Sequence, residues 1–174
     1  HVDACLGGLV LPFWPDTPAG PTMPEWDLRV ARVTSISADL HKYGFAPKGT
    51  SVLLSRGRTR HRAAWFATVD WPGYPVVNPT LAGSKPLEPA AAAWVVLEAL
   101  GEDGQRELVS RTAGATQALV EGLSAIEGMT LLDRDPGPLI AVAVDEHAPR
   151  EQRVHPHRWA DACGRRGIAV QAQP

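Results

Sequence analysis

The chain has 174 residues and a formal net charge of −2 at pH 7. This length suits one domain with a hydrophobic core, or parts of two domains. The near-zero charge argues against the broad basic surface that nucleic-acid binding needs. No apolar run reaches the length of a membrane span, and no secretory signal is present. The two cysteines, Cys5 and Cys163, lack metal-site or disulfide-framework spacing, which is typical of a cytoplasmic protein.

The N-terminal half predicts short strands separated by irregular segments. Residues 1–8, HVDACLGG, predict the end of a buried strand followed by a glycine turn. Residues 11–26 hold five prolines and predict a surface loop. Residues 32–39 and 50–56 predict two strands of a hairpin, joined by the loop KYGFAPKG. Residues 71–86 are again expected to be irregular.

The C-terminal half predicts two long helices and then a small α+β unit. Helices are expected at residues 88–100 and 105–127, with Gly101 and Gly104 between them. The second shows an apolar stripe at three- and four-residue steps, formed by Leu108, Thr112, Ala115, Leu119, Leu123 and Ile126. Strands at 129–133, 139–144 and 168–173 and a helix at 155–167 are expected to follow.

These elements predict part of an α/β protein with three regions. Residues 1–104 would be part of a large domain, 105–128 a connecting helix, and 129–174 a partial C-terminal small α+β domain. The chain starts at His1 inside a strand-like segment and ends directly after an apolar run. We therefore expect it to be a fragment of a larger protein, and we expect the isolated fragment to be inactive.

Asp3 and Lys42 form the first candidate pair, because each lies near the end of a predicted strand. Ligands of open α/β sheets bind outside the carboxyl ends of the strands. Pyridoxal phosphate uses a lysine for its Schiff base and a carboxylate opposite its pyridine nitrogen. An isolated Asp and Lys at strand ends are also commonly structural or solvated, so both interpretations stay open on spacing alone.

Further candidates have the same two interpretations. His41 could donate to a phosphate or bond a backbone carbonyl. Lys48, between Pro47 and Gly49, could meet an anion as a point charge or be a solvated turn lysine. Gly83 and Ser84 form a small-residue turn that could cradle phosphate. His155 and His157 lack a third ligand at metal-binding spacing, so no metal site is expected.

Several stretches, taken in order along the chain, resemble one family. They are HVDACLGG, WDLRV, VTSISADLHKYGFAPKGTSVLLSR, DWPG and TLAGS. They resemble the sphingosine-1-phosphate lyase-like branch of the pyridoxal-phosphate-dependent group II decarboxylases, which have fold type I. The block SADLHKYGFAPKG carries most of this resemblance, which extends from His1 to about residue 104 and continues faintly to the end.

The resemblance implies a role for each candidate. Lys42 matches the Schiff-base lysine, Asp3 the partner of the pyridine nitrogen, and Ala4 the small residue beside the ring. His41 matches a contact to the cofactor phosphate, and Lys48 a second lysine that meets the substrate phosphate. The turn formed by Gly83 and Ser84 matches one that reaches toward the partner subunit's cofactor phosphate, which implies a homodimer.

Two departures from the family pattern concern the substrate more than the cofactor. The family usually continues TLAGS with Arg-Pro-Gly-Gly, whereas this chain has Lys85, Pro86, Leu87 and Glu88. Loss of the glycines removes backbone freedom, and Glu88 adds a negative charge near the expected intersubunit site. The DWPGYPVVNP loop also differs from the family's Gly-Gly-Xaa-Tyr form.

The sequence therefore predicts a pyridoxal-phosphate-dependent carbon–carbon lyase. A retro-aldol cleavage of a phosphorylated long-chain amino alcohol would give an aldehyde and phosphoethanolamine. The first alternative is an amino-acid decarboxylase, which would share Asp3, His41 and Lys42 but has no general need for Lys48. The second alternative is a truncated, non-catalytic product.

Overall fold

The computed structural model describes residues 1–17, 23–80, 82–133 and 137–173. The chain divides into two compact units. The first holds residues 1–13 and 24–106, and the second holds residues 14–23 and 107–174. The boundary near residue 106 lies close to the predicted end of the large-domain segment, and we keep the three-region division as a proposal.

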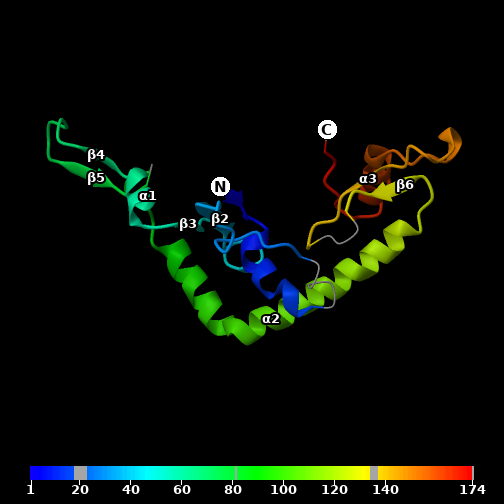
Figure 1. The fold of residues 1–174 in the computed structure, drawn as a ribbon, viewed down its shortest axis with the longest axis horizontal. Helices are drawn as coiled ribbons and strands as arrows, with labels where there is room; N and C mark the ends of the chain where they lie inside the picture. Colours follow the sequence, from blue (N-terminus) through cyan, green and yellow to red (C-terminus); the bar gives the residue numbers. More distant parts are fainter. Residues whose placement is uncertain (18–22, 81, 134–136, 174) are drawn as a thin grey trace. The chain divides into compact units, whose positions relative to one another are not determined.

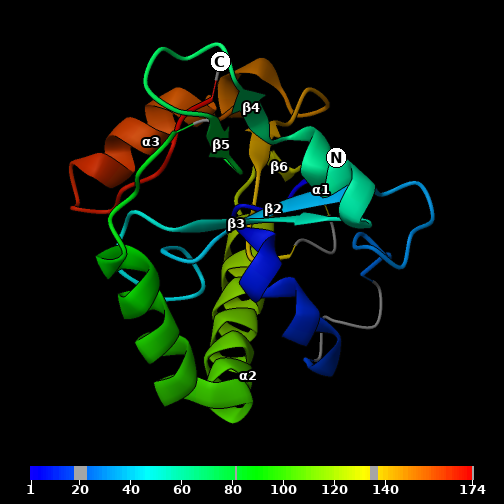
Figure 2. The ribbon, with the colours of Figure 1, turned by 90° about the vertical axis from the view of Figure 1, so that its left-hand side faces the viewer.

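The first unit is built on a three-stranded sheet with the order β1-β2-β3 (Figures 1 and 2). β1, Val2–Asp3, pairs in parallel with β2, Ser35–Asp39. β2 pairs antiparallel with β3, Ser51–Ser55, over five residue pairs. The predicted hairpin of residues 32–39 and 50–56 is therefore confirmed, with shorter strands. β2 buries Ile36 and Ala38, which are at most 5 % exposed, as the two-residue period of a strand requires.

The prediction that the first strand is buried is wrong. Val2 is half-buried and Asp3 is exposed. Among the described residues, β1 is an edge strand with a partner on one side alone, so its outer side faces solvent. On the opposite edge, Val52, Leu53 and Leu54 of β3 are also exposed.

The described start of the proline-rich segment, residues 11–17, is more regular than predicted, and residues 18–22 of that prediction lie outside the described residues. The short 3-10 helices Gly7–Leu9 (η1) and Leu11–Asp16 (η2) follow β1. Pro15 lies inside η2, where the tighter 3-10 turn tolerates it near the helix end. Trp14 in η2 is fully buried. Burial of the Trp14 side chain explains why residues 11–16 take a regular conformation although they contain prolines.

A second hairpin follows β3. Helix α1, Arg58–Ala63, is short and exposed. It leads into the antiparallel strands β4, Phe66–Thr68, and β5, Val76–Asn78 (Figure 1). The prediction of an irregular segment at 71–86 missed β5. Its two valines are flanked by prolines, and prolines lower the strand signal in the sequence.

The two predicted helices form one element, α2, Glu88–Ser124, with a break at Gly101. Gly101 has φ 59° and ψ −174°, a conformation that glycine adopts without the steric cost of a Cβ. The predicted apolar stripe is wrong by about one position. The chain instead buries Gln105, Val109, Ala113 and Thr116, because small and β-branched residues occur on several faces of this helix.

The second unit ends in short elements. Strands β6, Met129–Leu131, and β7, Val142–Val144, pair antiparallel. A 3-10 turn at Arg150–Gln152 (η4) and helix α3, Pro156–Gly164, follow. The predicted strand at 168–173 is wrong, because these residues form no ladder in the structure. An apolar composition without a pairing partner does not make a strand. Among the described residues, none of the helices combines the length and apolarity needed to cross a membrane.

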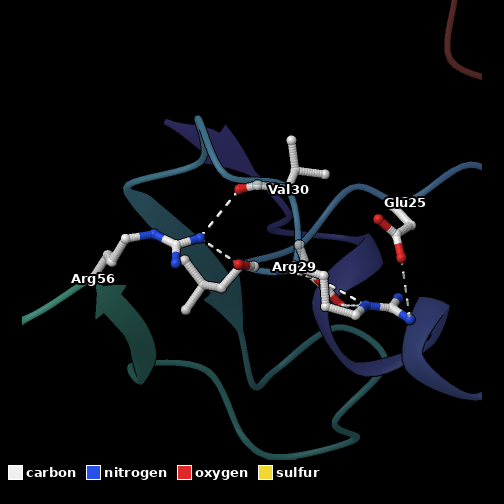
Figure 3. A network of polar contacts seen from close by, with 6 residues as sticks. Glu25, Arg29, Val30 and Arg56 are labelled. Carbon is white, nitrogen blue, oxygen red and sulfur yellow. Dashed lines mark hydrogen bonds and ion pairs between the residues drawn. The ribbon is translucent and has the colours of Figure 1, made fainter.

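An arginine holds the loop before β2 against the end of β3 (Figure 3). The guanidinium of Arg56 donates to the carbonyl oxygens of Val33 at 2.9 Å, of Val30 at 3.1 Å, and of Leu28. Nearby, Arg29 pairs with Asp27 at 3.0 Å and with Glu25 at 4.0 Å. The planar, five-donor guanidinium suits this task better than an ammonium would.

The loop after β2 packs on α2. Leu40 and Ala46 form a small core with Ala93 of α2, and Leu9 packs against it. The buried Gln105 side chain donates from Nε2 to the carbonyl oxygens of Leu9 and Tyr43, each at 2.7 Å. Gln105 thus ties α2 to the segments that follow β1 and β2.

We predict that Gln105→Ala loosens this loop. Its loss leaves two part-buried carbonyls without their donor, so the free energy of unfolding should fall by about 1–3 kcal/mol. Urea denaturation measures this fall, and hydrogen exchange at residues 40–46 should become faster. Gln117→Ala is the matched control. Gln117 is exposed on the same helix, so its removal should change stability by less than about 0.5 kcal/mol. Equal effects of the two substitutions would contradict this account.

Candidate active site

The parallel pairing of β1 and β2 brings two distant segments to one sheet edge. Val2 lies opposite Ile36 and Asp3 opposite Ser37. The ladder continues past the strand ends, because Ala4 N donates to Ser37 O at 2.9 Å and Asp39 N donates to Cys5 O at 3.3 Å. The residues after β1 and those after β2 therefore leave the sheet side by side.

A tight loop follows β2 and carries the HK pair. Lys42 N donates to Asp39 O at 3.4 Å and Phe45 N to Lys42 O at 3.1 Å. Phe45 has φ 56°, a left-handed conformation that is uncommon for a bulky residue. Gly44 leaves no space for a side chain, since a Cβ there would lie 2.5 Å from Leu40 O. These constraints hold Lys42 close to the end of β2.

Lys42 forms an ion pair with Asp39. Its Nζ lies 2.9 Å from Asp39 Oδ2. Asp39 Oδ1 accepts from Ser51 Oγ at 2.5 Å, across the Asp39–Ser51 pair of the β2–β3 ladder. The Lys42 and Asp39 side chains are 30 % and 20 % exposed, so the pair is partly shielded from water.

These contacts move both pKa values toward the charged forms. The Cys5 side chain first, and then the Asp39 carboxylate, raise the pKa of Lys42 above its usual 10.5. The hydroxyl of Ser51 and then the ammonium of Lys42 hold the pKa of Asp39 below its usual 3.8. In the folded protein, Lys42 is therefore an ammonium and Asp39 a carboxylate at neutral pH.

Asp3 and Ala4 lie at the end of β1. Asp3 Oδ1 accepts from Cys5 N at 3.0 Å and from Ser37 Oγ at 3.3 Å. The backbone N–H of Cys5 is the main cause of a lowered pKa for Asp3, and the charge of Lys42 adds to it. Asp3 is thus a fixed anion near Lys42, while Ala4 is 4 % exposed.

His41 points a polar atom into the structure without a partner. Its Nδ1 is buried and has no hydrogen-bond partner among the described residues. Its Nε2 lies 3.9 Å from Asp39 Oδ2, and its side chain is 24 % exposed. A buried ring nitrogen without a partner carries a desolvation cost, and an added acceptor such as a phosphate oxygen would remove that cost.

The structure does not bring every sequence candidate to this cluster. Lys48 is exposed, in the loop before β3. Gly83 and Ser84 lie in exposed bends before α2. The contacts that the structure defines for the cluster join Asp3, Cys5, Asp39, His41 and Lys42. Among the described residues, no group of three or more His, Cys, Asp or Glu side chains is arranged to hold a metal ion.

Sequence reasoning missed Asp39. Its signal is its place at the last position of β2, three residues before Lys42, where a single turn brings the two side chains together. Ser51 was also missed, because its contact to Asp39 depends on the hairpin register.

Comparison with known proteins identifies the family. No family model matches the chain. The chain is 39 % identical over 145 residues to sphingosine-1-phosphate lyase of Dictyostelium discoideum, which covers 83 % of this chain and 27 % of that protein. The solved sphingosine-1-phosphate lyase of Burkholderia pseudomallei is 32 % identical, with a TM-score of 0.86 over 99 % of this chain and 37 % of that one.

The chain belongs to the sphingosine-1-phosphate lyase-like branch of the group II decarboxylase family. Its fold is part of fold type I. A probable L-tyrosine/L-aspartate decarboxylase of Methanothermobacter thermautotrophicus is 29 % identical over 174 residues, covering 98 % of this chain and 44 % of that protein. The chain spans about a quarter of the length of the Dictyostelium discoideum lyase.

We predict that the Lys42–Asp39 pair makes stability depend on pH in a defined direction. Because the folded-state pKa of Asp39 is lowered, its contribution is present above the unfolded value of about 3.9. This contribution is lost as the pH falls through the folded value. Because the pKa of Lys42 is raised, its contribution is present below 10.5 and is lost as the pH rises through the folded value.

Urea unfolding at several pH values measures this effect. Asp39→Asn should be less stable than the unchanged protein at pH 6, and the difference should shrink toward zero in acid. Asp70→Asn, in the exposed turn between β4 and β5, should show no such difference at pH 6. A stability gap for Asp39→Asn that persists unchanged at pH 2 would contradict the electrostatic cause.

Proposed function

We propose that the full-length protein that contains this chain is a pyridoxal-phosphate-dependent carbon–carbon lyase that cleaves a phosphorylated long-chain amino alcohol. The products would be an aldehyde and phosphoethanolamine. The observation that carries the proposal is the parallel pairing of β1 with β2, which brings Asp3 and the turn that holds Lys42 to one sheet edge, where the charge of Lys42 helps to lower the pKa of Asp3. The family to which the chain belongs supports the lyase activity.

The residues present fit the cofactor. Lys42 would hold its aldehyde carbon, Asp3 would face its pyridine nitrogen, and Ala4 would leave room beside the ring. His41 would donate from its partnerless Nδ1 to the phosphate. Bound pyridoxal phosphate supplies an electron sink for the bond that breaks at the substrate Cα.

Each side chain contributes a distinct electrostatic effect. Asp3 is held as a carboxylate by the Cys5 N–H and the Ser37 hydroxyl, so it favours a protonated partner nitrogen. Lys42 carries a proton at Nζ that it can exchange with a substrate group in the same site. Ala4 and Leu40, which follow Asp3 and Asp39 in the chain, are buried.

Lys48 supports a phosphorylated substrate. It is exposed in the loop that begins with Lys42 and has Pro47 and Gly49 as neighbours. Exposure leaves its ammonium free to meet an anionic group, which a buried or paired lysine could not do without losing its partner. A decarboxylase has no general need for such a cation.

A homodimer is part of the proposal. The β4–β5 hairpin and its approach expose large apolar side chains, including Phe66, Val69, Trp71, Tyr74 and Val77. Monomeric proteins seldom leave such a group in water. We propose that a second copy covers this hairpin and that the turn at Gly83 and Ser84 reaches the partner's cofactor phosphate.

The similarity to the Methanothermobacter thermautotrophicus decarboxylase favours a second candidate, an amino-acid decarboxylase. It would use the same Asp3, His41 and Lys42 but break the bond to the carboxyl carbon. The greater identity to lyases favours the carbon–carbon lyase.

We predict that borohydride reduction in the presence of pyridoxal phosphate attaches the cofactor to Lys42. Peptide mass mapping locates the modified lysine. Lys42→Arg keeps the positive charge but should abolish the attachment, and Lys85→Arg should leave it unchanged. Attachment spread over Lys48 and Lys85, or unchanged attachment in Lys42→Arg, would contradict the assignment.

We predict that Lys48→Ala, made in the full-length protein that contains this chain, weakens binding of the phosphorylated substrate. Loss of one solvent-accessible charged contact should raise KM about tenfold, or about 1.4 kcal/mol. The kcat should change less, because Lys48 would hold a part of the substrate that does not react. Lys48→Arg is the matched control and should keep most of the affinity. If KM for a phosphorylated amino alcohol is the same in Lys48→Ala as in the unchanged protein, the lyase proposal loses its main support over the decarboxylase.

A further inference from the structure

Asp39 has defined contacts with three segments, two at its carboxylate and one at its backbone. Ser51 Oγ of β3 donates to Oδ1 at 2.5 Å, and Lys42 Nζ approaches Oδ2 at 2.9 Å. His41 Nε2 lies 3.9 Å from the same Oδ2. The backbone N–H of Asp39 also donates to Cys5 O at 3.3 Å. Asp39 is therefore fixed at its backbone and at one oxygen, and it presents the other oxygen to Lys42.

We propose that Asp39 is a positioning residue that holds Lys42 as an ammonium, with its Nζ anchored at the end of β2, until the site is loaded. This inference rests on the proposed role of Lys42 as the cofactor lysine. The sequence comparison and the proposed function assign Asp39 no role. Ser51 acts through Asp39, because its hydroxyl fixes the rotamer that faces Lys42.

The geometry distinguishes Asp39 from the other nearby carboxylate. Asp3 has its Oδ1 occupied by Cys5 N and Ser37 Oγ, and no ion-pair contact within 4.0 Å joins it to Lys42. Asp39 makes that contact directly at 2.9 Å. The two acids thus divide their tasks, since Asp39 holds the lysine while Asp3 keeps an oxygen available for another group.

Pairing with Asp39 lowers the reactivity of Lys42 as a nucleophile. An amine attacks a carbonyl carbon only in its neutral form, so an ammonium held by a carboxylate is protected from stray aldehydes. Each unit by which the pKa of Lys42 exceeds that of a free lysine lowers its neutral fraction about tenfold at neutral pH. The cofactor must displace Asp39 from Nζ, and removal of the negative charge should make Lys42 more reactive.

The charged and titratable groups near Lys42 come from two places. Asp3 and Cys5 lie at and after β1, and Asp39 and His41 lie at the end of β2 and in the following turn. From β3 the neutral Ser51 contacts Asp39. Among the described residues, neither α1 nor α2 makes an ionic contact with Lys42. Substitutions after β1 and at the end of β2 can therefore separate the contributions of these groups to the pKa of Lys42.

Competitive acetylation of the cofactor-free protein tests the proposal. A neutral lysine takes an acetyl group from acetic anhydride and releases acetate and a proton, so the labelling rate against pH reports the pKa of each lysine. Mass mapping gives separate rates for Lys42, Lys48 and Lys85. The midpoint is the pH at which the acetylation rate of a lysine reaches half of its maximum. We expect the midpoint of Lys42 to fall in Asp39→Asn, with about tenfold more labelling at pH 8 for each pH unit of that fall.

Three further variants make the result decisive. Ser51→Ala keeps the charge and should shift the Lys42 midpoint in the same direction by a smaller amount, which provides a second test if Asp39→Asn does not fold. Asp3→Asn should shift it less than Asp39→Asn does. Asp27→Asn, whose carboxylate pairs with Arg29, should leave it unchanged.

The outcomes separate this inference from the proposed function. An unchanged Lys42 midpoint in both Asp39→Asn and Ser51→Ala would overturn the positioning role, as would a larger shift in Asp3→Asn. The measurement uses no cofactor. If borohydride fails to attach pyridoxal phosphate to Lys42 while the midpoint still shifts, the cofactor role of Lys42 fails and the ion pair stands.

Discussion

The parallel pairing of β1 with β2 is the constraint on which the candidate site depends. Two residue pairs and the two hydrogen bonds beyond them fix Asp3 and Cys5 beside Ser37 and Asp39. Parallel strands run in the same direction, so both chains leave the sheet at the same edge. A slip of one residue in this register would turn Asp3 to the other face of the sheet and separate it from Lys42.

The neighbouring contacts make that edge rigid. The β2–β3 ladder sets Ser51 opposite Asp39, and the Ser51 hydroxyl fixes the carboxylate that holds Lys42. From the other side, Gln105 of α2 binds the carbonyls of Leu9 and Tyr43. The charged groups are thus placed by backbone hydrogen bonds and one buried amide. A site held by such contacts has its side chains fixed in place before any ligand binds.

The sequence predicted the strands that carry the site, because β2 and β3 alternate and their loop is rich in glycine and proline. Their positions near predicted strand ends made Asp3 and Lys42 a candidate pair, and the family resemblance gave each of them a role that stays a prediction. It did not predict the Asp39–Ser51 contact, since a hairpin register joins residues that are twelve positions apart. The exposure of Asp3 was missed because burial depends on which strands flank β1. The buried face of α2 was predicted wrongly because small and apolar residues occur on several faces of this helix.

The account is tested most directly by measuring whether the pyridine nitrogen of bound pyridoxal phosphate is protonated. Pyridoxal phosphate labelled with ¹⁵N, bound to the protein, reports by NMR whether this nitrogen is protonated. The account predicts a protonated nitrogen in the unchanged protein and in Asp39→Asn, and loss of that proton in Asp3→Asn. A ring nitrogen with the same chemical shift in the unchanged protein and in Asp3→Asn would show that β1 does not place its carboxylate at the cofactor, and would contradict the central claim.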